Sequence, residues 1–361
     1  MKEKRLFLDI HAIQTLPPSN VNRDDAGSPK TAQYGGVTRA RVSSQAWKKA
    51  MRDYFKEHGV QNVGVRTLEV GELVKSKLLE LDKTLGEDEA LEIAIDVLNK
   101  AGFGVDKKKG ASKALVFMIS KQAENLAKIG LGKENCDKVK DEDLIKMVNK
   151  EPSVDLALFG RMVASKTELN IEASCQVAHS ISTHAVDDDF DFYVAIDDFN
   201  VEKQGAGMLG VVEFNSSTVY RYTDLNLHQF HSQISEKEEF IESIKLFIDA
   251  FIKSMPTGKI NSFANQTIPQ AVIINLREDR PLNLVSAFEE PIKSSNGYVK
   301  PSIEKLFEEH EKYSVVLEKP LFTNYLLLSE NKDIAEIGKK EESVKSLIED
   351  VAKKIEDYFE I

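Results

Sequence analysis

Cysteine and long apolar runs are scarce in this sequence, and each scarcity excludes a class of protein. Only Cys136 and Cys175 occur in 361 residues, which excludes a disulfide scaffold and is typical of a reducing cytosol. No apolar run approaches the roughly 20 residues that a membrane-spanning helix needs. The charged start, MKEKRLFLDI, has neither a long apolar run nor a small-residue cleavage site behind it. We therefore expect no signal peptide, no membrane contact and a cytoplasmic location.

Three motifs of common enzymes are also missing from the sequence: the P-loop, the GxSxG elbow and the dinucleotide fingerprint. Asp24-Asp25 and the acidic residues at 187–191 could hold Mg²⁺, although adjacent aspartates in loops more often form turns. Cys175 lies four residues before His179, and His184 lies five after it, so no complete metal-ligand set is visible and packing or hydrogen-bonding roles are favoured. We expect no catalytic residue, no cofactor and no metal.

Positive charge is deficient in the chain as a whole but gathers near its start. The formal net charge is −11. Residues 1–56 hold 11 Lys and Arg against 5 Asp and Glu, a net charge of +6, whereas the remainder holds 37 against 54, a net charge of −17. A general polyanion-binding protein is usually basic throughout. The pattern indicates one local anion-binding track on an acidic body, with a chance cluster of solvated charge as the alternative.

Hydrophobic periodicity predicts a mixed α+β fold. Strands are expected at 5–14, 190–199, 211–222 and 270–276. Helices are expected after Ser43 or Ser44, near 67–82, 87–100, 111–130 and 141–149, behind a capping box at Ser235 and Glu238, and at 343–359. Residues 17–42 have no helical periodicity and read as a long loop. With 67–150 set aside as a helical insertion, the order is βαββαβ, the arrangement of ferredoxin-like and RNA-recognition folds.

The helix that follows Ser43-Ser44 has two faces of opposite character. Apolar residues recur at helical spacing and predict a buried face of Trp47, Ala50, Met51, Tyr54 and Phe55. Lys48, Arg52 and Lys56 lie four apart, so they form one line on the other side. One helical turn rises about 5.4 Å, roughly the spacing of successive phosphates in a single strand.

The loop before this helix supplies further features that suit an anion. Gly35-Gly36 carry no side chains, and the first amides of the helix can donate to a phosphate. Upstream cations are Arg23, Lys30, Arg39 and Arg41. Ordinary exposed lysines on an amphipathic helix are the alternative interpretation.

Two apolar residues could wedge between bases. Met162 follows Gly160-Arg161 in LFGRMVAS, and Leu209 lies near the end of the glycine-bearing stretch VEKQGAGML. If exposed, both could separate stacked bases. Core packing is the alternative for an isolated methionine.

Taken together, several stretches resemble the CasC-type backbone subunit of the type I-E CRISPR Cascade complex. They are LDIHAIQTLPPS, NRDD, GGVTRARVSSQ, WKKAMR, LFGRMVAS, QVAHSISTHAVDDDFDFYVAIDD, LGVVEFNSSTVYRYTDLNL and AFEEPIKSSNGYVKPSI. The resemblance covers most of the chain in order and is weakest at 60–150 and in the final helix. It implies a palm of RNA-recognition type formed by 1–60 and 151–361, helical fingers at 61–150, and a thumb hairpin at about 199–212.

The resemblance also implies a function. Copies would stack head-to-tail along one CRISPR RNA, together with other Cascade subunits, and bind the guide through its backbone so that its bases can pair with target DNA. Each thumb would displace one base, so that pairing proceeds in short segments. The implied RNA-binding residues are Arg23, Lys30, Ser43, Gln45, Lys48, Lys49, Arg52, Arg161, Met162 and Leu209.

Two other functions remain open. A metal-dependent backbone subunit that cleaves target RNA, as in type III complexes, would use Asp24 or Asp25. A stand-alone RNA-binding protein would recognise one short motif, whereas the scaffold should bind guides of any sequence. The leading hypothesis is the non-catalytic scaffold.

Overall fold

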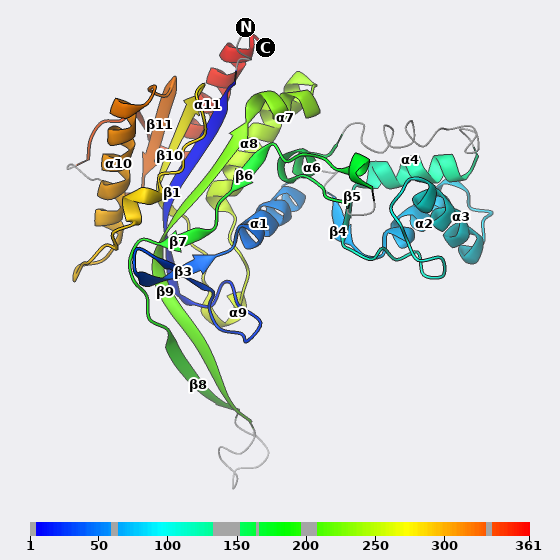
Figure 1. Cartoon of the computed structure of the whole chain (residues 1–361), viewed down its shortest axis with the longest axis horizontal. Helices are drawn as coiled ribbons and strands as arrows, with labels where there is room; N and C mark the ends of the chain where they lie inside the picture. Colours follow the sequence, from blue (N-terminus) through cyan, green and yellow to red (C-terminus); the bar gives the residue numbers. More distant parts are fainter. Residues whose placement is uncertain (1–4, 59–63, 133–151, 164–165, 196–207, 330–333) are drawn as a thin grey trace. The chain divides into compact units, whose positions relative to one another are not determined.

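The computed structural model describes residues 5–58, 64–132, 152–163, 166–195, 208–329 and 334–361. They form the mixed α+β fold that the sequence predicted, traced in Figure 1. The chain divides into two compact units. The first comprises Met1–Tyr54, Gln176–Leu227 and Ile244–Ile361, and the second comprises Phe55–Cys175 and His228–Ser243. Within the described ranges, no helix is both long and apolar enough to cross a membrane.

A ten-stranded sheet organises the first unit (Figure 1). Its main path runs β12-β11-β10-β1-β9-β7-β3-β2, and β6 and β8 pair with β9 off this path. Neighbours along the path are antiparallel except for β11 with β12. The strands are β1 (Phe7–Ser19), β2 (Thr31–Tyr34), β3 (Val37–Val42), β6 (Cys175–Val177), β7 (Ser180–Ser182), β8 (Asp189–Ala195), β9 (Met208–Asn226), β10 (Pro269–Arg277), β11 (Phe322–Leu327) and β12 (Lys339–Glu341).

The region expected as a loop at 17–42 is a loop only at 20–30 and at the turn of Gly35-Gly36, and the remainder is strand, so the prediction was wrong for those strand residues. β1 continues to Ser19, and β2 and β3 form a hairpin that turns at Gly35-Gly36. Both glycines have positive φ, and a Cβ on Gly35 would lie 1.7 Å from the carbonyl oxygen of Glu289. Only glycine fits this turn, because any side chain would collide with the backbone that the turn packs against.

The strand expected at 190–199 is present as β8, but it does not take the expected place in the sheet. β8 pairs with β9 alone, and the neighbour of β9 on the main path is the three-residue strand β7. Residues 196–199 lie outside the described residues, as do positions 199–207 of the predicted thumb. The strand expected at 211–222 is the longer β9, and that at 270–276 is β10.

Helix α1 (Ser44–Glu57) packs on one face of the sheet through the predicted apolar stripe. The buried members are Trp47, Ala50, Met51 and Phe55, with Tyr54 half-buried. The indole of Trp47 donates to Ser180 Oγ at 3.0 Å, and the guanidinium of Arg221 stacks on its ring at 3.7 Å. Arg221 also donates to the carbonyl of Phe251 in α8 (Lys237–Lys253) at 2.6 Å. One buried arginine of β9 therefore binds both helices to the same face.

Helix α10 (Val299–Val316), which the sequence did not predict, covers the opposite face of the sheet. Phe307 and Phe288 pack there among apolar residues of β1, β9 and β10. A polar group is buried on the same face: Asp9 accepts hydrogen bonds from Tyr222 Oη at 2.9 Å and from the amide of Leu282 at 3.0 Å. Burial raises the pKa of Asp9 to about 8. The carboxyl is therefore largely protonated at neutral pH.

The second unit is mainly helical, as expected for the insertion. Its helices are α2 (Val70–Leu81), α3 (Glu87–Lys100), α4 (Ser120–Gly130), α6 (Val154–Phe159) and most of α7 (Leu227–Gln233). The helix expected at 111–130 begins only at Ser120, because β5 (Val116–Met118) pairs with β4 (Val65–Thr67). The helix expected at 141–149 lies outside the described residues. The remaining helices, α9 (Ile260–Phe263) and α11 (Val344–Phe359), belong to the first unit.

Candidate nucleic-acid interface

Ser43 forms the start of α1 and fixes the position of its first turn. The hydroxyl of Ser43 accepts a hydrogen bond from the amide of Ala46 at 3.3 Å, and its carbonyl accepts one from the amide of Trp47 at 3.2 Å. The serine cap expected at this point is therefore present and belongs to Ser43. Ser43 itself is buried, whereas Gln45 in the first turn is exposed. The cap holds the helix amides in place beside the preceding loop.

The segment 22–30 is bound to this helix start by Asn22. The side-chain oxygen of Asn22 accepts from the amide of Ser43 at 2.9 Å, and its carbonyl accepts from the amide of Lys30 at 2.9 Å. Asp24 closes the turn between them, since its Oδ1 accepts from the amides of Ala26 and Ser28 at 2.9 and 3.0 Å. The loop therefore has a defined conformation that places Arg23 and Lys30 near the start of α1.

The predicted cations of this region form one surface, which we call the basic ridge: Arg23, Lys30, Lys48, Lys49 and Arg52. Arg23 and Lys49 are exposed, and the other three are half-buried. Lys49 pairs with Asp53 at 2.5 Å while its side chain remains 70% exposed, so the pair is well solvated and can be exchanged for another anion at little cost. Asn22 and Ser43 join the loop to the start of the helix, so the cations of both elements are carried on linked segments of one scaffold.

Arg39, expected among the upstream cations, lies in the core instead. Its guanidinium donates to four backbone carbonyls, those of Tyr34, Ser182, Phe288 and Glu289, at 2.8 to 3.3 Å. Its side chain is completely buried. Arg39 therefore connects the β2–β3 hairpin to β7 and to the segment after Leu284, and it presents no donor at the surface.

Arg161 and Met162 belong to the second unit, whereas all residues of the basic ridge belong to the first. Arg161 is buried and donates to the carbonyl of Leu169 at 2.8 and 3.0 Å and to Gln122 Oε1 at 3.2 Å, and burial lowers its pKa to about 10. Met162 is 80% exposed between buried neighbours. Arg161 therefore has a structural role in the second unit, and the exposure of Met162 removes core packing as an explanation of that residue.

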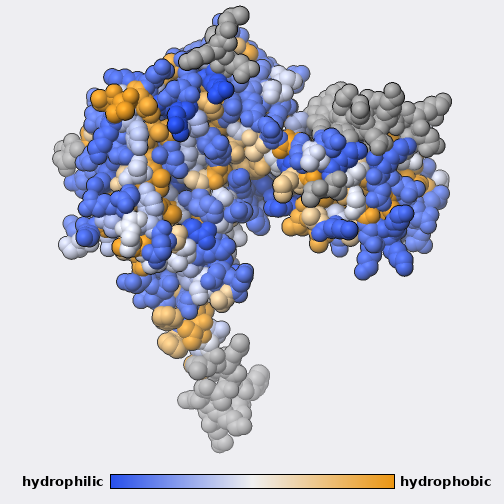
Figure 2. Space-filling view, in the orientation of Figure 1, coloured by the Kyte–Doolittle hydropathy of each residue, from blue (hydrophilic) through white to orange (hydrophobic). Residues whose placement is uncertain are grey.

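Leu209 lies in β9 directly opposite Val194 of β8. The ribbon of β8 and β9 carries an apolar face that the sequence did not single out, visible as the apolar surface above the grey atoms in Figure 2. Its exposed members are Phe190 (57%), Phe192 (69%), Val194 (45%) and Val211 (49%). The alternation of the three β8 residues was the available signal, since it places them on one face of the strand.

The other chemical candidates have structural roles. His184 stacks on Tyr298 with ring centroids 3.6 Å apart, and its Nε2 accepts from the amide of Thr218 at 3.1 Å. Asp188 accepts from the side-chain amide of Asn215 at 2.9 Å, and the side chain of Cys175 is buried. Among the residues that the structure describes, no three His, Cys, Asp or Glu side chains are placed to hold a metal ion.

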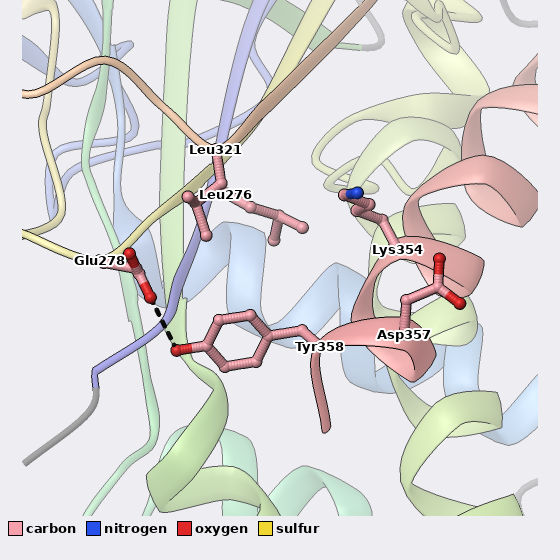
Figure 3. Close-up of a pocket in the computed structure, with 6 residues that line it drawn as sticks. All are labelled: Leu276, Glu278, Leu321, Lys354, Asp357 and Tyr358. Atoms are coloured by element: carbon pink, nitrogen blue, oxygen red, sulfur yellow. Dashed lines mark hydrogen bonds between the residues drawn. The ribbon is translucent and has the colours of Figure 1, made fainter. Parts of the chain in front are cut away.

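A pocket of about 310 Å³ lies elsewhere in the first unit (Figure 3). It is lined by Leu276, Glu278, Leu321, Lys354, Asp357 and Tyr358, and the Tyr358 hydroxyl donates to Glu278 at 3.0 Å. Two carboxylates face one ammonium group there, which disfavours a phosphate. The pocket contains none of the predicted RNA-binding residues.

Comparison with known proteins gives one family and a set of similar folds. The model of the family described as CT1975-like protein matches residues 8–354. One similar solved structure, a chain of a CRISPR RNA-guided surveillance complex described as pre-nicking, is 30% identical with a TM-score of 0.84, and the match covers 96% of this chain and 99% of that one. Another, from a CRISPR RNA-guided surveillance complex, is 26% identical with a TM-score of 0.75 over 96% of this chain and 99% of that one. No curated protein matches the chain.

Proposed function

Because this chain belongs to the CT1975-like protein family, we propose that it is a backbone subunit of a CRISPR RNA-guided surveillance complex of type I-E. Several copies bind one guide RNA head-to-tail, beside other subunits of the complex. The near-complete overlap with two chains of such complexes supports the assignment to this class. The type I-E assignment rests on the sequence stretches quoted above.

The observation that carries the proposal is the basic ridge on a fixed scaffold. A protein that holds a guide must bind phosphates and leave the base edges free for pairing. Lys48 and Arg52 are one turn apart on α1, and Ser43 with Asn22 connects that helix to the loop of Arg23. These cations, with Lys30, Gln45 and Lys49, contact the sugar-phosphate backbone, so guide binding does not depend on base sequence.

The sheet order supports a palm of RNA-recognition type. The strands β10-β1-β9-β7 follow the order 4-1-3-2 of a ferredoxin-like sheet, with α1 and α8 as its two helices. We assign the palm to 1–60 and 151–361, the fingers to 61–150 and the thumb hairpin to about 199–212. Met162 and Leu209 are then the apolar residues beside each displaced base, since exposure of the Met162 side chain leaves it available for such a contact.

The scaffold is non-catalytic, and the conformation of the loop aspartates supports this over RNA cleavage. Oδ1 of Asp24 accepts two amide hydrogen bonds within its own turn, so the carboxylate already has a structural role in the loop. We expect the assembled complex to leave complementary RNA intact in the presence of Mg²⁺. Cuts at regular spacing that disappear in Asp24→Ala would instead establish the cleaving function.

The decisive experiment is to purify the chain with its partner subunits and sequence the RNA that copurifies. We expect repeat-derived ends flanking many different inserts. Recovery of one recurrent short motif would favour a sequence-specific RNA-binding protein. Recovery of no RNA from a folded complex would refute the proposed function.

A further inference from the structure

Three basic side chains meet beside the basic ridge, where strand β3 pairs with β7. Arg41 of β3 lies opposite Ile181 of β7, and His179 immediately precedes β7. The guanidinium Nη1 of Arg41 lies 3.1 Å from His179 Nδ1, and its Nε donates to the carbonyl of Thr31 at 3.1 Å. The amide of Arg41 donates to the carbonyl of Lys30 at 2.9 Å. Arg41 and His179 are therefore in direct contact, and the charge of Lys30 also acts on the His179 ring, so the three residues form one basic cluster on the first unit.

The hydrogen bond between Arg41 and His179 fixes the state of the imidazole. A guanidinium can only donate, so Nδ1 of His179 must be the acceptor and its proton must be on Nε2. His179 is exposed, and Nε2–H is therefore a donor that can serve a ligand. The ring is neutral in this geometry.

The charges around His179 are all of one sign. Partial burial, Arg41 and Lys30 lower the pKa of His179, in that order. Arg41, on β3, and Lys30, in the loop before β2, are the two charged groups that act on the ring. No acidic group in the described ranges offsets their effect on the pKa of His179. Two cations with no carboxylate beside them disfavour the charged ring and leave a local positive potential, which a bound anion would neutralise.

We propose that Lys30, Arg41 and His179 together bind one phosphodiester of the guide, and that His179 takes up a proton when the phosphate docks. The inference rests on the proposed function and adds Arg41 and His179 to its contacts. Arg41 supplies planar donors, Lys30 a point charge, and His179 an Nε2–H donor whose strength increases on protonation. The proton enters at Nδ1, the only ring nitrogen with a lone pair, so the Arg41 N–H that it accepts is released from the ring and turns to the phosphate. The ligand class is a phosphodiester rather than a base, because all three groups can donate hydrogen bonds and two of them carry a positive charge.

Proton uptake gives the binding a definite pH dependence. A bound phosphate lowers the positive potential at the ring, so the pKa of His179 is higher in the complex than in the free protein. Affinity is then highest below both pKa values, falls as the pH rises between them, and is lowest above both. One linked proton limits the change to about tenfold per pH unit.

The test measures the affinity of the full chain for a radiolabelled single-stranded RNA between about pH 5.5 and 8.5. We expect wild type to bind about 5- to 10-fold more weakly at the upper end. The variant His179→Gln should vary by less than about twofold and match wild type at high pH. His231→Gln, which removes a histidine of the second unit, is the matched control and should keep the wild-type pH dependence.

A second measurement does not depend on a variant folding. In wild type labelled with ¹³C-histidine, the titration midpoint of the His179 ring should rise when the same RNA is added, a change that a purely structural histidine would not show. A midpoint that stays constant or falls, or a His179→Gln variant with the wild-type pH dependence, overturns the inference while leaving RNA binding itself intact. Failure of wild type to bind RNA at any pH would instead refute the proposed function.

Discussion

Removing Lys48 and Arg52 together tests the contact between the basic ridge and phosphate most directly. Both side chains are half-buried and lie outside the buried stripe of α1, although the Nε atom of Arg52 is itself buried. Each phosphate contact with a single strand contributes about 0.7 to the slope of log affinity against log salt concentration. The double variant Lys48→Ala/Arg52→Ala should therefore have a slope smaller by about 1.4.

This change in slope predicts a measurable difference in affinity. Over a fourfold rise in salt, wild type should lose about 7-fold more affinity than the double variant. At low salt the variant should bind more weakly by about 2 kcal/mol, at about 1 kcal/mol for each solvent-screened contact. Because phosphates are the same in every guide, the loss should be equal for guides of unrelated sequence.

Filter binding at several salt concentrations, with at least two unrelated guide sequences, measures both quantities. The control variant Lys300→Ala/Lys312→Ala removes the same charge from α10, so it separates direct contact from a general change in net charge. Thermal unfolding of both variants checks that the fold is retained. A slope equal to that of wild type in Lys48→Ala/Arg52→Ala would refute phosphate contact by this pair, and so would a loss that depends on guide sequence.

Three further outcomes follow from individual residues. Met162→Ala should change stability by less than about 0.5 kcal/mol because the side chain is 80% exposed, and it should preserve guide binding while altering the periodic pattern of displaced bases; chemical probing that shows an unchanged pattern would contradict its role. Arg39→Met should lower the free energy of unfolding by about 3–5 kcal/mol, because it removes the donor of four carbonyls, two of them in fully buried hydrogen bonds; a loss below about 1 kcal/mol in urea unfolding would contradict this. The pKa of Asp9 is raised in the folded state to about 8 from 3.8, so the folded protein holds the extra proton and wild type should lose stability relative to Asp9→Asn as the pH rises between those values. The difference in melting temperature between the two proteins should therefore widen from pH 5 to pH 8, and a constant difference would be evidence against a buried, protonated carboxyl.

The sequence predicted the elements whose signal is local. Apolar spacing identified the buried face of α1, and the helix at 87–100 has the expected bounds. A serine cap was expected at Ser43 or Ser44 and is formed by Ser43. These features depend on the 3.6-residue period and on side chains within one turn, both of which can be read without knowledge of distant contacts.

Prediction failed where distant segments determine the structure. The hairpin at 31–42 was missed because Gly35 is required by the carbonyl of Glu289, more than 250 residues away, and not by a local pattern. The strand beside β9 was misplaced because β7 has only three residues, too few for a periodic signal, whereas β8 has a strong pattern but pairs with β9 alone. Phe190 and Phe192 are exposed because, within the described chain, β8 has β9 as its strand partner and no other strand pairs with it.

The stretch VTRARV separates what the sequence determined from what the tertiary structure decided. The sequence determined that cations gather near the amino end of an acidic chain and that α1 presents some of them on one side. It could not distinguish Arg39 from Arg41, which are two residues apart with the same side chain. Three of the four carbonyls that receive Arg39 come from positions 143 to 250 residues away. Their convergence compensates the guanidinium for its lost hydration, so one arginine is buried in the core and the other remains beside His179 at the surface.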